Sequence, residues 1–210
     1  MKDWKMILGV VLGAVILVGV MVWGLSKMSG EQGGLNVEVD QLVDGAGWVT
    51  GGENYQVTVV EFADLQCSAC KQAEPVAEEL RQMDGVRYVY RHLPLLTIHK
   101  NTWRAARVAE AAKVMEKGWE MVELLFEKQE EWAETGSFDK KAMDYAIELG
   151  LEGGKFEELY NSKEVEDQIV KDNTLANELR LGGTPTFFVE GEQVASSFVL
   201  TRVREILESN

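Results

Sequence analysis

Cys67 and Cys70 are the only cysteines in this chain of 210 residues, and two residues separate them. A pair with this spacing occurs in thiol–disulfide redox sites and in one half of many zinc sites. Residues 56–62 before the pair form a short apolar run of the kind found in buried strands, and residues 71–83 after it carry apolar side chains at helical spacing. Because redox pairs lie at such a strand-to-helix junction, we interpret the cysteines as a redox site.

Redox chemistry at this pair requires one cysteine to ionise near neutral pH, since only a thiolate attacks a disulfide sulfur. Cys67 is expected at the N-terminus of the helix, where unpaired backbone N–H groups favour an anion. Cys70 can then reach Cys67 across one helical turn and release a bound partner. A zinc site would need two further ligands, for which the chain offers only His92 and His99. We interpret both histidines as structural and expect no metal.

An apolar segment at residues 6–25 contains no charged side chain. As a helix, it would rise roughly 1.5 Å per residue and span roughly 30 Å, the thickness of a bilayer's hydrocarbon core. Trp4 and Trp23 lie at its two ends, where amphipathic rings favour the interface. The lysines before the segment favour a cytoplasmic N-terminus. We therefore expect residues 1–27 to be an N-terminal transmembrane anchor with its flanks, and the rest of the chain to be exported.

A cleaved secretory signal is the alternative to the anchor, because Gly24 and Ser26 are small residues at the spacing of a cleavage site. The apolar segment is longer than such signals have, which favours the anchor. Residues 28–55 are expected to form a flexible tether and one short strand at 35–42, where apolar residues alternate. Glycines at 45–52 predict a loop before the next strand.

Residues 56–210 are expected to form one α/β domain that contains a block of helices. The expected elements are strands at 56–62 and 86–93, a helix at 71–83, a helical stretch from 97 to about 181, strands at 186–189 and 193–195 joined by a turn at 191–192, and a closing helix at 201–207. Because the helical block separates two strand-and-helix segments, we interpret it as an insertion at about 97–181.

The charge of the chain limits its partners. A formal net charge of -14 argues against nucleic acid, because phosphate binding requires a basic surface. Charged residues make up 27% and hydrophobic residues 46% of the chain, which is typical of a globular protein. Two cysteines allow at most one disulfide, which excludes a miniprotein stabilised by several disulfides.

The arrangement resembles the DsbA-like branch of the thioredoxin superfamily, the exported thiol–disulfide oxidoreductases with a helical insertion. The resemblance covers residues 56–207. The motifs that carry it are E-F-A-D-L-Q-C-S-A-C at 61–70, Pro75, Y-R-H-L-P-L at 90–95, and G-G-T-P-T-F-F-V at 182–189. It implies an α/β fold, namely a thioredoxin fold with an inserted all-helical subdomain, which the single predicted transmembrane helix would precede.

The resemblance also implies roles for five residues. Cys67 resembles the family's exposed nucleophile and Cys70 its buried resolving cysteine. Glu61 matches the family's buried acid, which would relay a proton for Cys70, because an unpaired buried carboxylate is costly and tends to be protonated. Pro185 matches the family's cis-proline facing the disulfide, and the backbone of the preceding Thr184 would pair with a substrate strand.

Each of these roles has an alternative. Glu61 can instead be an exposed glutamate at a strand edge, and Pro185 an ordinary trans proline in a turn. The cysteine pair encloses Ser68-Ala69, where familiar relatives have Pro-His, Pro-Tyr or Gly-Pro. No histidine between the cysteines can stabilise a thiolate, so the sequence leaves the strength of the oxidant open.

The resemblance implies a membrane-anchored, extracytoplasmic protein-disulfide oxidoreductase that donates a disulfide to reduced exported proteins. A quinone-linked membrane protein of the DsbB or vitamin K epoxide reductase type would reoxidise it. We expect a monomer without a cofactor. Two alternatives remain, a disulfide reductase or isomerase of the same fold and a non-catalytic, chaperone-like binding module.

Overall fold

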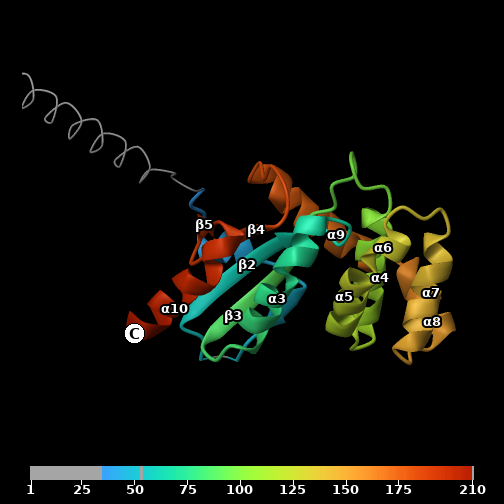
Figure 1. Cartoon of the computed structure of the whole chain (residues 1–210), viewed down its shortest axis with the longest axis horizontal. Coiled ribbons are helices and arrows are strands. Elements are labelled where there is room, and N and C mark those ends of the chain that lie inside the picture. Colours follow the sequence, from blue (N-terminus) through green and yellow to red (C-terminus); the bar gives the residue numbers. More distant parts are fainter. Residues whose placement is uncertain (1–34, 53, 210) are drawn as a thin grey trace, which may run out of the picture. The chain divides into compact units, whose positions relative to one another are not determined.

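A mixed five-stranded sheet organises the computed structural model, which describes residues 35–52 and 54–209 (Figure 1). In spatial order the strands are β1 (Trp48–Thr50), β3 (Val86–His92), β2 (Val57–Ala63), β4 (Thr186–Val189) and β5 (Glu192–Val194). The central strand β2 is parallel to β3 and antiparallel to β4. The edge strands β1 and β5 are each antiparallel to their neighbour.

Helices occupy most of the chain between β3 and β4. The helices are α2 (Val39–Val43), α3 (Ser68–Gln82), α4 (Thr102–Val114), α5 (Gly118–Glu127), α6 (Gln129–Trp132), α7 (Phe138–Glu148), α8 (Gly153–Tyr160), α9 (Lys163–Glu178) and α10 (Val199–Ser209), with a single 3-10 turn η1 (Ser196–Phe198) before α10. Figure 1 shows α4 to α8 gathered beside the sheet rather than within it. The predicted α/β fold is confirmed.

Alternation along β2 sends its side chains into two cores, and every residue of the strand is buried. Val57 and Val59 belong to a core that α3, α4, α5 and α10 share. Val60 and Phe62 point to the opposite face, where α2 and α9 cover the sheet. A strand covered on both faces is apolar throughout, which explains the short apolar run in the sequence. Glu61 is the one acidic residue of β2, and it lies on the face of the sheet that α3 covers.

A buried ion pair fixes the helical block to the sheet. Arg91 on β3 and Asp172 on α9 are both fully buried, and Nη1 of Arg91 lies 2.7 Å from Oδ1 of Asp172. The guanidinium also donates to the carbonyls of Leu42 and Asp44, at 2.7 Å each. Because a buried charge is tolerated only when it is paired and hydrogen-bonded, this arrangement sets the position of α9 and α2 on the sheet.

The strand predicted at 35–42 is wrong, since α2 begins at Val39 within it. The apolar residues alternate from Leu35 to Val39, but from Val39 onward the next ones follow at three and four residues, which is helical spacing. Leu42 is fully buried against the sheet. An isolated bridge between Asn36 and Glu192 joins this segment to β5, and the N–H of Val37 donates to the carbonyl of Gly191 at 2.9 Å. A short helix buries Leu42 where a strand would have extended past it.

The loop predicted at 45–52 contains the edge strand β1. Trp48 pairs with Tyr90 in the sheet and is buried, and its indole N–H donates to the carboxyl of Glu110. The burial of this ring outweighs the glycines around it. The turn between β4 and β5 is also one residue earlier than predicted, at Glu190 and Gly191, whose positive φ angles of 49° and 83° are those of a type I′ turn.

The predicted anchor at residues 6–25 and the tether after it lie outside the described residues. Among the helices of residues 35–52 and 54–209, none combines the length and the apolar character that crossing a bilayer requires.

Candidate active site

Cys67 lies at the start of α3, as its N-cap residue, and its side chain is half-buried. The first turn of α3 contains no acidic residue. The pKa of Cys67 is lowered to about 5, first by a hydrogen bond from Cys70, and further by the side chain of Thr184 and the backbone N–H groups of Cys70 and Ala69, against an opposing effect of burial. Cys67 is therefore a thiolate at neutral pH, stabilised first by the Cys70 thiol and then by Thr184 and the unpaired donors of the helix terminus.

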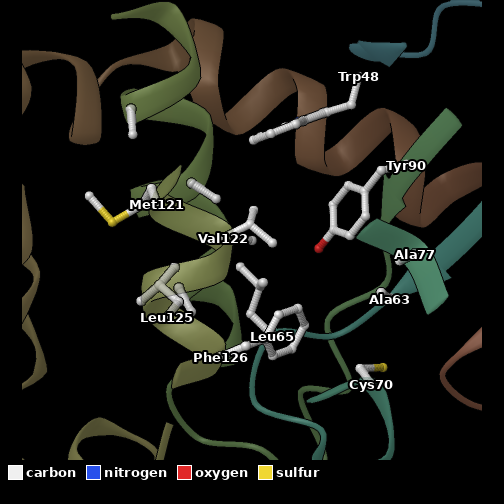
Figure 2. Close-up of a cluster of buried hydrophobic side chains, with 14 of the residues drawn as sticks. Trp48, Ala63, Leu65, Cys70, Ala77, Tyr90, Met121, Val122, Leu125 and Phe126 are labelled. Carbon is white, nitrogen blue, oxygen red and sulfur yellow. The ribbon is translucent and has the colours of Figure 1, made fainter. Parts of the chain in front are cut away.

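Cys70 is one helical turn further and is buried in the core (Figure 2). The figure shows its sulfur at the border of the apolar cluster, close to Ala63 on β2. The backbone N–H of Asp64 donates to Sγ of Cys70 at 3.5 Å. Burial raises the pKa of Cys70 strongly, and the hydrogen bond to Cys67 and the charge of Glu61 raise it further. The two sulfurs thus differ in protonation state at neutral pH.

Glu61 is buried on the face of β2 that α3 covers, and its side chain accepts a hydrogen bond from the hydroxyl of Tyr88 on β3. Burial raises the pKa of Glu61 to about 8, an effect that the Tyr88 hydrogen bond and Arg81 reduce and the charge of Glu74 increases. The carboxyl is therefore largely protonated at neutral pH, and when it ionises its charge raises the pKa of Cys70. Its role as a proton relay stays a prediction.

Thr184 and Pro185 precede β4 and are joined by a cis peptide bond. Sγ of Cys67 lies 3.4 Å from the carbonyl O of Thr184, to which it donates when the sulfur is protonated. The hydroxyl of Thr184 is buried and makes no hydrogen bond within the described part of the chain in this form. It can donate to Cys67 once that sulfur is ionised, which agrees with its contribution to the lowered pKa of Cys67.

Asp64, which sequence reasoning missed, fixes the loop between β2 and the cysteines. Its buried carboxylate accepts hydrogen bonds from the backbone of Gln66 at 2.7 Å and of Leu95 at 2.8 Å, and from the hydroxyl of Thr102. Nδ1 of His99 lies 2.8 Å from the same carboxylate. The only signal in the sequence was an acidic residue directly after a buried strand.

Gln129, at the start of α6, fixes the same loop from the helical block. Its buried side-chain amide donates to the carbonyls of Leu65 at 2.8 Å and of Cys67 at 3.2 Å. Gln66 adds a second connection, donating to the carbonyl of Ala133 at 2.7 Å. These contacts join segments more than sixty residues apart in the chain, so local sequence patterns could not indicate them.

The two histidines are paired with carboxyl groups rather than with the cysteine sulfurs. Nε2 of His92 lies 3.1 Å from Oε1 of Glu110, and both side chains are buried. His99 pairs with Asp64 as described above. Each histidine connects the helical block to the sheet or its loops, which agrees with a structural role.

The arrangement supports thiol–disulfide exchange in its chemistry. An ionised, accessible sulfur at Cys67 can attack a disulfide or leave from one, and a protonated, buried sulfur at Cys70 can resolve the resulting mixed disulfide. Glu61 is available to exchange a proton with Cys70, because its pKa of about 8 is close to neutral pH.

The family model described as Thioredoxin matches residues 44–209. A thioredoxin-like oxidoreductase from Silicibacter pomeroyi superposes with a TM-score of 0.66 and 28% identity, covering 83% of this chain and 99% of that one. The thiol-disulfide exchange protein alpha-DsbA2 from Wolbachia pipientis gives a TM-score of 0.68 at 22% identity over 80% and 91% of the two chains. Oxidised BdbD from Bacillus subtilis gives 0.67 at 21% identity over 84% and 97%. The last two likenesses describe the fold.

Curated relatives carry a different kind of name. The Na+/H+ antiporter NhaA 3 of Salinispora tropica is 39% identical over 146 residues, which are 69% of this chain and 22% of the antiporter. NhaA 1 of Salinispora arenicola is 36% identical over 170 residues, or 74% of this chain and 25% of that protein. The chain thus spans about a fifth to a third of the length of the curated relatives it matches.

The substitution Thr184→Val tests the hydrogen bond to the thiolate. In the wild-type protein, the rate of Cys67 alkylation by iodoacetamide should rise with pH through about 5 and then level off. Removing the hydroxyl deletes a donor to the charged form, so the midpoint should move upward by about one pH unit. Alkylation rates measured across the pH range give both midpoints.

Thr174→Val is the matched control, because it removes a hydroxyl that is bonded to the carbonyl of Val170 on α9. Its midpoint should equal that of the wild type. An unchanged midpoint in Thr184→Val would mean that the hydroxyl does not contact the thiolate.

Proposed function

The chain belongs to the thioredoxin family, and from this premise we propose that it is a thiol–disulfide oxidoreductase that works by exchange at Cys67. The observation that carries the proposal is the unequal state of the two sulfurs. The pKa of Cys67 is lowered to about 5, whereas that of the buried Cys70 is strongly raised. A structural disulfide or a metal site does not require the two cysteines to differ in pKa, whereas an exchange reaction depends on this difference.

We propose disulfide donation as the direction of the reaction. A substrate thiolate attacks Sγ of Cys67 in the Cys67–Cys70 disulfide; a bond to the substrate sulfur forms and the bond to Cys70 breaks. Cys70 leaves with the electron pair and takes a proton from Glu61. A second substrate thiolate then attacks the substrate sulfur of the mixed disulfide, and Cys67 leaves as a thiolate. The substrate has lost two electrons and the cysteine pair has gained them.

The stability of the Cys67 thiolate favours this direction over reduction. Stabilising the thiolate stabilises the reduced protein, which makes the disulfide a stronger oxidant. The pKa of Cys67, about 5, is below the value of about 7 in thioredoxin and above that of about 3.5 in DsbA. The thiol of Cys70, Thr184 and the helix-terminal N–H groups thus stabilise the thiolate in place of the histidine that the residues between the cysteines do not supply.

The proposed location is the outer face of a membrane, with residues 6–25 as the anchor. Its support is the uncharged apolar sequence of that segment. Reduced exported proteins would be the substrates of a monomer, and a quinone-linked membrane protein of the DsbB or vitamin K epoxide reductase type would be the reoxidant. Ion transport forms no part of the proposal, because the chain spans at most about a third of the antiporters it matches.

Serine substitutions of the two cysteines test the exchange mechanism. Cys67→Ser should abolish the oxidation of a reduced model protein, since no thiolate remains to form the mixed disulfide. Cys70→Ser should accumulate mixed disulfides with substrate proteins in cells, visible as thiol-sensitive bands on non-reducing gels. The double serine variant is the matched control and should form none.

Two outcomes contradict the mechanism. Absence of trapped partners in Cys70→Ser argues against exchange through Cys67. Complementation of a deletion strain by the double serine variant indicates a chaperone-like module whose thiols are dispensable.

Protease accessibility tests the proposed location. Protease added to cells with an intact cytoplasmic membrane but a permeable wall should digest residues 36–210 of the full chain. Protection until that membrane is permeabilised would place the domain in the cytoplasm and contradict the proposal. A cytoplasmic protein of known location, followed in the same cells, controls for membrane integrity.

A further inference from the structure

Tyr88 is the hydrogen-bond partner of Glu61 in the interior beneath α3. Both side chains are buried, and the phenol hydroxyl donates to Oε2 of the carboxyl. The pKa of Tyr88 is raised well above its ordinary value by burial and by the charge of Glu61, so the hydroxyl keeps its proton and remains a donor. A donor that never ionises stabilises the carboxylate over the carboxylic acid.

Arg81 and Glu74 form a charged pair on α3 that acts on the same carboxyl. Nη2 of Arg81 lies 2.8 Å from Glu74 and 3.2 Å from Glu123, and the guanidinium lies 4.4 Å from the ring centre of Trp119. The Arg81 side chain is only 7% exposed. The positive charge of Arg81 and the negative charge of Glu74 affect both Glu61 and Tyr88, with opposite signs.

The two cross-strand neighbours of Glu61 are aromatic residues. Its neighbour across β3 is Tyr90, whose hydroxyl has no hydrogen-bond partner within the described residues and points toward Val122 in Figure 2. On the other side, β4 contributes Phe187 at the same level. The titratable and charged groups that act on Glu61 or lie beside it are Tyr88 and Tyr90 on β3 and Cys70, Glu74 and Arg81 on α3.

We propose that Tyr88 is the positioning residue that holds Glu61 ready to accept the proton of Cys70, and that the Arg81–Glu74 pair sets the pH at which this transfer occurs. The proposal rests on the exchange function proposed above and assigns the control of its buried step. Tyr88 does not touch either sulfur in the hydrogen-bond pattern; it acts through Glu61.

The step concerned is the resolution of a mixed disulfide at Cys67. Cys70 gives its proton to the carboxylate of Glu61, and its sulfur attacks Sγ of Cys67. The Cys67–Cys70 bond forms, the bond from Cys67 to the partner sulfur breaks, and the partner leaves as a thiolate. The rate follows the fraction of Glu61 that is ionised, so it should rise with pH and level off above about 8.

The experiment follows this step alone in the full-length protein. Cys67 is converted at low pH to its mixed disulfide with thionitrobenzoate by excess dithionitrobenzoate, because Cys70 attacks slowly there. The pH is then raised by rapid mixing to a series of values from about 6 to about 10. Release of the coloured thionitrobenzoate anion gives the first-order rate constant at each pH. The midpoint of the curve of this rate constant against pH reports the pKa of Glu61.

The variants should move the midpoint in opposite directions. Tyr88→Phe removes a donor to the carboxylate, so the midpoint should rise by about one pH unit and the rate at about pH 7 should fall about tenfold, with the plateau retained. Glu74→Gln removes a negative charge, so the midpoint should fall. Tyr90→Phe is the matched control and should leave the midpoint in place, since it deletes a neighbouring buried hydroxyl that has no hydrogen-bond partner among residues 35–52 and 54–209.

A merely structural role for Tyr88 would slow release at every pH without moving the midpoint, and that result overturns the proposal. The proposal is equally overturned if Tyr88→Phe and Tyr90→Phe shift the midpoint alike, or if Glu74→Gln shifts it upward. Glu74→Gln keeps the test decisive should Tyr88→Phe fail to fold. Failure of the proposed function looks different, because the wild-type mixed disulfide would then release no thionitrobenzoate.

Discussion

The N-terminus of α3 is the constraint on which the rest of the site depends, since it places the thiol of Cys70, and then the N–H groups of Cys70 and Ala69, where they stabilise the thiolate of Cys67. These groups reach the sulfur only if the helix begins directly after Cys67. The loop before it is therefore fixed on both sides. On one side, Asp64 accepts a hydrogen bond from the backbone N–H of Gln66 in the loop. On the other side, the amide of Gln129 donates to carbonyls of the loop and of Cys67. The helical block thus contributes directly to the position of the nucleophile.

The second requirement is that the two sulfurs lie in opposite environments. Cys67 faces Thr184 at the edge of the core, whereas Cys70 lies inside it beside Asp64 and Glu61. One turn of helix separates solvent-accessible from buried positions, which is why the spacing of the pair suits exchange. The same burial that keeps Cys70 protonated raises the pKa of Glu61 to about 8. A single apolar core therefore tunes both the thiol and its proton acceptor.

Local patterns in the sequence were sufficient for the elements that carry the cysteines, because the apolar run of β2 and the helical spacing of α3 are strong signals. They failed where burial of one side chain decided the outcome, as for Leu42 in α2 and Trp48 in β1. Cys67, Cys70, Glu61 and Pro185 came from motifs of the family. Asp64, Tyr88 and Gln129 did not, since their partners lie far away in the chain and only the folded backbone brings them together.

The reduction potential of the Cys67–Cys70 pair tests the central claim, that stabilisation of the Cys67 thiolate makes this protein a disulfide donor. The purified full chain would be equilibrated in glutathione buffers of known poise, and the fraction of oxidised protein measured after acid quenching and thiol labelling. A stabilised thiolate predicts a potential well above that of thioredoxin, toward the value of about -120 mV found for DsbA. A potential near about -270 mV, the thioredoxin value, would contradict it.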